Sequence, residues 1–132
     1  MLGELVAEGQ GKRTGRRVLS ADPLKVEVSF EESLTILGVQ AQDIGTYWAT
    51  PRADGTLYGE GQGVIMTAEG DLITWVGSGT GKMGAGGAVS YRGALHTSTT
   101  AAKFARLNSV ALVFEFEVDA AGNTKSKDWE WK

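Results

Sequence analysis

The sequence predicts an all-β protein: a single closed antiparallel β-barrel of about eight strands, in largely up-and-down order. Three observations favour this class. Stretches that alternate apolar and polar residues recur at roughly 10–15-residue intervals, with hairpin-type turns between them. Two of these stretches carry glycine at every second position, namely Gly59, Gly61 and Gly63, then Gly77, Gly79 and Gly81. A single short segment, near residues 99–107, suits a helix.

The two glycine rows explain why the sheet is expected to close. Side chains alternate between the two faces of a strand, so each row leaves one face bare. The opposite face carries polar residues such as Glu60 and Ser78. A bare face lets a strand bend sharply, or lets another group press against its backbone. Closure also removes the exposed edges that long strands otherwise present.

The first half of the chain supplies the opening strands. The tetrapeptide Glu-Gly-Gln-Gly of residues 8–11 is repeated identically at residues 60–63. This repeat suggests a glycine-interrupted strand at the N-terminus as well. A turn is expected at Asp22-Pro23, because the residue before proline is pushed from helical toward extended geometry. Another is expected at Asp54-Gly55, because glycine accepts a positive φ. The strands expected in this half cover residues 25–31, 44–50 and 56–67.

The second half continues the antiparallel order. Residues 99–107 form the helix candidate, with threonine as a cap and Ala101, Phe104 and Leu107 recurring about once per turn. Residues 84–87 read as a flexible connection. The strands expected in this half cover residues 71–82, 88–98, 110–119 and 125–131.

Composition narrows the protein class. A length of 132 residues with 42% hydrophobic residues fits one globular domain, residues 1–132. The net charge of −3 gives no electrostatic support for nucleic-acid binding. No leader or bilayer-spanning apolar run is recognisable, so the expected location is cytoplasmic, without membrane association. The absence of cysteine excludes thiolate chemistry, and a single histidine disfavours the usual metal sites, so no metal or cofactor is expected.

The segment Gly77–Lys82 has the glycine and lysine of a phosphate-binding loop, but its spacing is wrong. Such a loop needs glycine five positions before the Gly-Lys pair and serine or threonine after the lysine. Val76 and Met83 occupy those positions. The glycines are therefore interpreted as structural.

Aromatic residues are the first candidates for a binding site. Large rings opposite a glycine-cleared wall either fill the gap or leave an apolar slot. A barrel of eight strands is just wide enough to be packed solid or to hold one small ligand, and both alternatives stay open at this point. The candidates for the apolar walls are Trp48, Tyr58, Trp75 and Tyr91.

A second candidate group lies on one strand, where Arg92 and His96 share a face. If that face points into the barrel, the two side chains need carboxylate partners such as Glu115, since an unpaired buried charge is costly. If it points outward, they are ordinary solvated groups. The outward alternative is favoured, because Tyr91 and Leu95 on the other face are the more natural core pair.

The segments Gly59–Thr67, Asp71–Trp75 and Val89–Leu95 resemble the glycine-alternating strands of the small allene-oxide-cyclase-like barrels, an architecture shared by several uncharacterised bacterial proteins. The resemblance implies an eight-stranded antiparallel barrel with a partly apolar interior, often assembled into homo-oligomers. It matches no catalytic position and implies no cyclase activity.

Together these observations predict a cytoplasmic barrel that binds a small, largely apolar molecule in its interior or at its mouth. Arg92 or Glu115 would orient a polar end of the ligand. One alternative is an isomerase or cyclase acting on a small hydrophobic substrate, with a carboxylate or His96 transferring a proton. Another is a non-catalytic structural module that works as a homo-oligomer.

Overall fold

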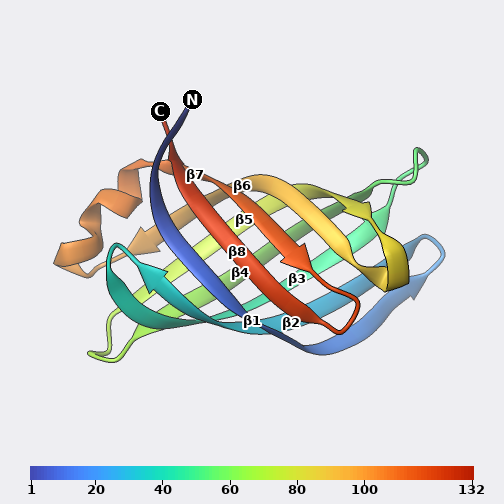
Figure 1. The fold of residues 1–132 in the computed structure, drawn as a ribbon, viewed down its shortest axis with the longest axis horizontal. Helices are drawn as coiled ribbons and strands as arrows, with labels where there is room; N and C mark the ends of the chain where they lie inside the picture. Colours follow the sequence, from blue (N-terminus) through green and yellow to red (C-terminus); the bar gives the residue numbers. More distant parts are fainter.

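The computed structural model describes residues 1–132 and shows one sheet closed on itself (Figure 1). Each strand is antiparallel to the next along the chain, and β8 pairs with β1 to complete the cylinder. The predicted fold class is thereby confirmed. The strands are β1 (Leu2–Ala21), β2 (Leu24–Ile36), β3 (Val39–Pro51), β4 (Leu57–Thr67), β5 (Leu72–Met83), β6 (Val89–Thr99), β7 (Ala111–Val118) and β8 (Asn123–Trp131).

The glycine rows of β4 and β5 stand beside one another and face the interior. In the register of this pair, Gly59 lies opposite Gly79 and Gly61 opposite Gly77, and Gly63 lies opposite Trp75. A Cβ atom added to Gly63 would lie 2.5 Å from indole atoms of Trp75. The missing side chains therefore make room for large rings that come from other parts of the barrel wall.

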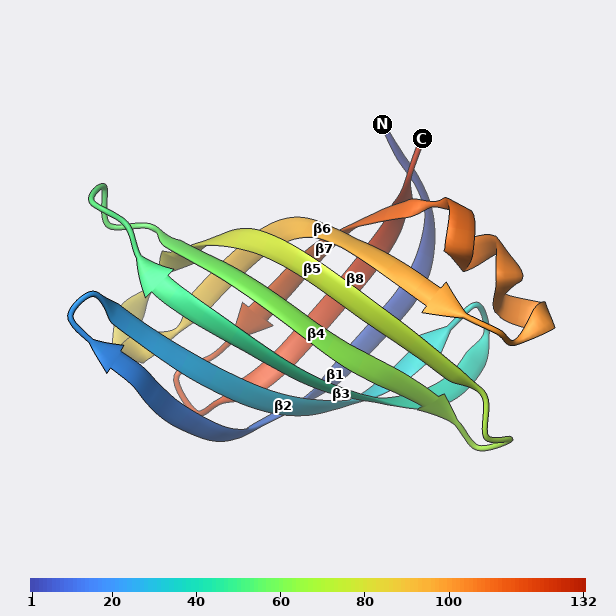
Figure 2. The ribbon, with the colours of Figure 1, turned by 180° about the vertical axis from the view of Figure 1, so that it is seen from behind.

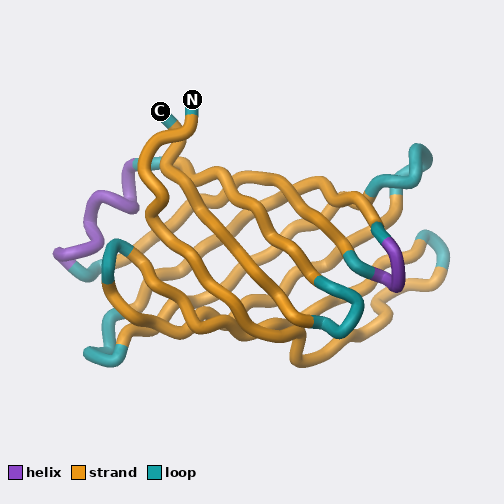
Figure 3. The backbone as a smooth tube through the Cα atoms, in the orientation of Figure 1, coloured by secondary structure: helices purple, strands orange, loops and turns teal.

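One end of the barrel is closed by a short helix. We call it the lower end; it carries the β2–β3 and β4–β5 turns and the 3₁₀-helix η2 (Ala102–Ser109). Figure 3 shows η2 at this end and the shorter η1 (Ala85–Gly87) at the other. Phe104 and Leu107 of η2 are 1% and 0% exposed and pack against Ile36 and Ile73. These residues form an apolar floor.

The observed helix starts later than residues 99–107 suggested. Thr99 still belongs to β6, where its hydroxyl donates a hydrogen bond to the carbonyl oxygen of Leu72. The same hydroxyl accepts a hydrogen bond from the amide of Ala101. Thr99 therefore stabilises the turn before the helix, while Ala101 is the N-cap residue. The segment expected to be a flexible connection, residues 84–87, contains the single turn η1. None of the chain's helical segments has the length and apolar character needed to cross a bilayer.

The opposite, upper end carries hairpin turns and η1. The turn at Asp54-Gly55 forms as expected, with Gly55 at a φ of 88°. The β1–β2 and β3–β4 hairpins both project at this end (Figure 2). Residues 15–21 of β1 pair only with β2, because β8 begins at Asn123, which lies opposite Lys12.

Candidate functional site

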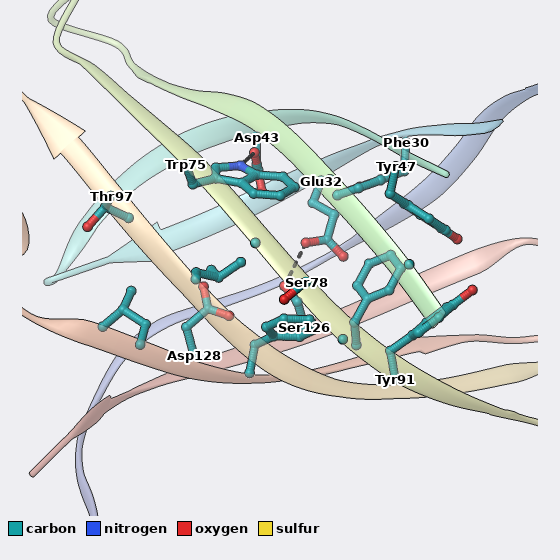
Figure 4. Close-up of a pocket in the computed structure, with 18 of the residues that line it drawn as sticks. Phe30, Glu32, Asp43, Tyr47, Trp75, Ser78, Tyr91, Thr97, Ser126 and Asp128 are labelled. Atoms are coloured by element: carbon teal, nitrogen blue, oxygen red, sulfur yellow. Dashed lines mark hydrogen bonds between the residues drawn. The ribbon is translucent and has the colours of Figure 1, made fainter. Parts of the chain in front are cut away.

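The barrel interior contains a cavity of about 80 Å³ between the apolar floor and the upper end (Figure 4). One side of it is bare backbone, contributed by the glycine rows of β4 and β5. The facing walls come from inward side chains of β2, β3, β6, β7 and β8. The interior is therefore partly hollow. Its aromatic lining residues are Phe30, Tyr47, Trp75, Tyr91, Phe114 and Phe116.

Aromatic rings in mutual contact form the upper part of the cavity wall. Phe30 and Phe116 have ring centroids 4.9 Å apart, and Tyr47 meets Tyr91 edge to face at 5.6 Å. Such tilted and edge-on contacts are favourable beyond the area that they bury. Burial raises the pKa of Tyr91 to about 12 and raises the pKa of Tyr47 as well. Both phenol groups are therefore uncharged at neutral pH and can donate or accept a hydrogen bond.

Three carboxyl groups form the lower part of the wall. Glu32 on β2 lies directly opposite Asp43 on β3, and Asp128 projects from β8. Glu32 accepts hydrogen bonds from the hydroxyls of Thr124 (2.7 Å) and Ser126 (2.6 Å). Asp43 accepts one from the indole nitrogen of Trp75, at 2.8 Å (Figure 4). We refer to Glu32, Asp43 and Asp128 as the carboxyl cluster.

Asp128 differs from the other two members. It is only 9% exposed, lines the cavity, and accepts no hydrogen bond from the protein. Burial, with the charges of Asp43 and Glu32 adding to it, raises the pKa of Asp128 to about 8. Burial likewise raises the pKa of Asp43 to about 7, even though the Trp75 hydrogen bond acts in the opposite direction.

Burial raises the pKa of Glu32 too, because desolvation outweighs its two hydroxyl hydrogen bonds. The cluster therefore holds protons at a pH where exposed carboxyl groups are ionised. These groups can donate a hydrogen bond, accept one, or transfer a proton inside an apolar chamber. Carboxyl groups with raised pKa values inside a cavity are typical of functional sites.

Arg13 is the one basic side chain that the fold turns inward near the aromatic wall. It lies directly opposite Phe30 in the β1–β2 pairing, is half-buried, and places its guanidinium beside Gly122. Burial is the main cause of the raised pKa of Tyr47, and the charge of Arg13 opposes part of that rise. A cation therefore lies near enough to Tyr47 to affect its pKa, although Arg13 itself does not line the cavity.

Two of the seven candidate site residues lie in this cavity, namely Trp75 and Tyr91. Trp48 and Tyr58 pack against one another on the outer face, with ring centroids 5.8 Å apart, and Lys25 covers the Trp48 ring at 4.4 Å. Trp48 is one residue along from the inward Tyr47, so the alternation of the strand turns it outward.

The other three candidates lie together on the outer face of β6 and β7. Arg92 is exposed and pairs with the half-buried Glu117 at 2.8 Å and Glu115 at 3.7 Å. His96 is exposed on the same face. The alternation of β6 thus follows the favoured interpretation, with Tyr91 and Leu95 inside. The charges are solvated, and the structure does not join them to the cavity.

Sequence reasoning missed the carboxyl cluster because polar residues were assumed to face solvent. Thr124, Ser126 and Asp128 alternate along β8, and that polar row points inward. Glu32 gave a usable signal, since it shares the parity of Phe30 and Leu34 on a strand whose other inward residues are apolar. An acidic residue in an apolar row of a small barrel is a candidate for an interior site.

No known protein family and no curated protein matches the chain. Solved structures do match it in fold. A protein of unknown function from Clostridium acetobutylicum has a TM-score of 0.82 at 12% identity, over 96% of this chain and 94% of that one. A β-barrel-like protein from Acinetobacter baumannii has a TM-score of 0.80 at 13% identity, over 98% and 94%.

An enzyme from Penicillium herquei is also similar, with a TM-score of 0.67 at 16% identity, over 96% of this chain and 92% of that one. At these identities the likeness concerns the fold. The chain therefore belongs, by architecture, among small β-barrel proteins.

Proposed function

We propose that this protein binds a small, largely apolar molecule inside the barrel. The observation that carries the proposal is the cavity itself, with a glycine wall on one side and aromatic rings on the other. Pockets of this kind, mostly apolar with a few convergent polar groups, are the usual form of small-molecule sites. We assign Trp75 and Tyr91 to the apolar walls of the site. The carboxyl cluster, in place of Arg92 and Glu115, would contact the polar end of the ligand.

The size of the cavity limits the ligand. Its volume of about 80 Å³ is about half of the roughly 150 Å³ of an engineered apolar cavity that takes up benzene. A branched molecule of four or five heavy atoms fits this space directly. A single aromatic ring fits if Tyr47 or Phe116 rotates, since these rings line the cavity.

Thermal unfolding with millimolar isobutanol, toluene and benzyl alcohol tests the proposal. A ligand that binds only the folded state stabilises it by about 2.7 kcal/mol at one hundred times its Kd. We expect Leu95→Phe, which fills the cavity, to abolish the rise in Tm. His96→Phe, which adds the same ring one residue along on the outer face, should retain it. A Tm unchanged by all three compounds contradicts the proposal.

A second candidate is an isomerase or cyclase acting on a small hydrophobic substrate. It is favoured by the pKa of about 7 at Asp43 and of about 8 at Asp128, since a general acid or base works best near the operating pH. One fold neighbour is described as an enzyme, which supports catalysis on this fold without indicating the reaction. For any substrate found, turnover that survives both Asp43→Asn and Asp128→Asn rules these residues out.

A structural role as a homo-oligomer is supported by apolar residues on the outer face. Ile44 on β3 and Val76 on β5 are 39% and 54% exposed. Exposed apolar residues mark surfaces through which copies associate when they form a contiguous patch. We also propose a kinship with the allene-oxide-cyclase-like barrels, which often assemble into homo-oligomers. Sedimentation of the purified chain decides the point, and a strict monomer excludes the structural role.

A further inference from the structure

The lower part of the cavity concentrates acidic groups with no basic partner. Glu32, Asp43 and Asp128 reach it from β2, β3 and β8. No lysine, arginine or histidine is among the residues that line the cavity. Arg106 pairs with Glu130 at 2.8 Å at the lower end, and Arg13 acts on Tyr47 in the upper part.

Asp128 is the member whose hydrogen-bonding capacity is unused. The other two carboxyl groups accept hydrogen bonds from Thr124, Ser126 and Trp75. Asp128 accepts none, although it is more than nine-tenths buried and lines the cavity. A buried carboxylate without a partner is costly, so the empty protein neutralises it with a proton. A cationic ligand atom could take the place of that proton.

We propose that the cavity ligand carries a basic nitrogen, held as an ammonium group by Asp128 beside Asp43 and Glu32. The inference rests on the proposed function, because it names the chemistry of a ligand in the same cavity. Charge-assisted hydrogen bonds from an ammonium to carboxylates are among the stronger ones. The aromatic rings of Trp75 and Phe30 nearby favour a desolvated cation as well.

The geometry favours an organic cation over a metal ion. No three histidine, aspartate or glutamate side chains are arranged so that they could hold one metal ion. An ammonium group on an apolar skeleton instead needs only one carboxylate in direct contact. Other carboxylates stabilise it by electrostatic attraction over a longer distance. The aliphatic and aromatic wall then covers the rest of the molecule.

The test compares amines with alcohols of the same shape. The pairs are isobutylamine with isobutanol and benzylamine with benzyl alcohol, titrated at pH 7 by calorimetry. We expect each amine to bind at least about tenfold more tightly than its alcohol. Asp128→Asn should remove the preference, so that amine binding falls to the level of the matched alcohol in the same variant. Glu31→Gln, the outward neighbour of Glu32, should leave the preference intact.

Proton release gives a second readout that needs no variant. The titratable groups that face the bound nitrogen are the carboxyl groups of Glu32, Asp43 and Asp128, with the phenols of Tyr47 and Tyr91 above them. An amine that enters as an ammonium drives ionisation of the cluster, so binding at pH 7 should release about one proton. Titrations in two buffers with different ionisation enthalpies measure this number. Alcohols should release none.

The outcomes separate the two proposals. Alcohols that bind as tightly as the amines, or an amine that releases no proton, overturn this inference and leave the proposed function standing. If neither member of either pair binds, both proposals fall. An amine preference that persists in Asp128→Asn overturns the role of that residue.

Discussion

At the scale of single residues, Asp128 shows how an acidic side chain becomes neutral inside a small barrel. Its ordinary pKa near 3.8 rises to about 8, first because of burial and then because Asp43 and Glu32 are close. No hydrogen bond offsets the rise, whereas Asp43 has the Trp75 indole. The interior therefore tolerates Asp128 at neutral pH mainly in its protonated form, and burial raises the pKa values of Asp43 and Glu32 in the same direction.

This protonation makes the stability of the protein depend on pH. The folded chain binds more protons than the unfolded chain between about pH 4 and pH 8, so its stability is greatest at the acidic side of that window and falls as pH rises through it. Asp128→Asn should weaken this dependence and raise the Tm at pH 9 relative to the wild-type protein by about 5 °C. Calorimetric scans from pH 5 to pH 9 provide the measurement.

Two controls accompany that prediction. Glu31→Gln, on the solvent side of β2, should keep the wild-type slope. Some slope should also persist in Asp128→Asn, because the pKa values of Asp43 and Glu32 are raised in the same direction. A variant that is less stable than the wild-type protein at pH 9 would mean that ionised Asp128 does not destabilise the fold, which contradicts the raised pKa of this group.

At the scale of elements, the glycine rows of β4 and β5 permit close packing of the wall. A Cβ atom at Gly63 would lie 2.5 Å from both the Trp75 indole and the carbonyl oxygen of Ile44. Gly63→Ala should therefore destabilise the fold by about 1–3 kcal/mol through overpacking. Gly15→Ala is the matched control, since nothing lies within 4 Å of its added methyl group. Urea unfolding of both variants measures the difference.

The control should be neutral or slightly stabilising, by about 0.4–1 kcal/mol, because alanine restricts the unfolded chain more than glycine does. Equal effects of the two substitutions would show that the glycines act through backbone freedom alone. The space that they leave for Trp75 would then be incidental.

Most elements could be predicted because strand alternation is a local property of the sequence. The inward row of β7, which includes Leu112, Phe116 and Val118, follows directly from its pattern. The carboxyl cluster could not be predicted in the same way, because it depends on which residues of β2, β3 and β8 meet across the closed interior. That meeting follows from register and closure, and alternation within one strand does not specify either.

At the scale of the whole molecule, closure depends on pairing the two ends of the chain. Lys12 of β1 lies opposite Asn123 of β8, so this seam joins segments that are far apart in the sequence. Deletion of residues 123–132 should leave β1 and β7 each without one neighbouring strand and abolish the cooperative thermal transition. Deletion of Lys132 alone is the control. Circular dichroism during heating measures the transition, and cooperative unfolding without β8 would show that closure is dispensable.

The projecting half of β1 has a consequence for how copies of the chain avoid one another. Residues 15–21 offer backbone donors and acceptors on a side with no neighbouring strand, which is the usual starting point of fibril growth. Arg16 and Arg17 lie in that stretch and are exposed. Arg17 also pairs with Glu27 across the hairpin, at 3.3 Å. Charged side chains on an unpaired strand edge disfavour the addition of another chain, so a variant that lost both arginines is expected to self-associate more readily.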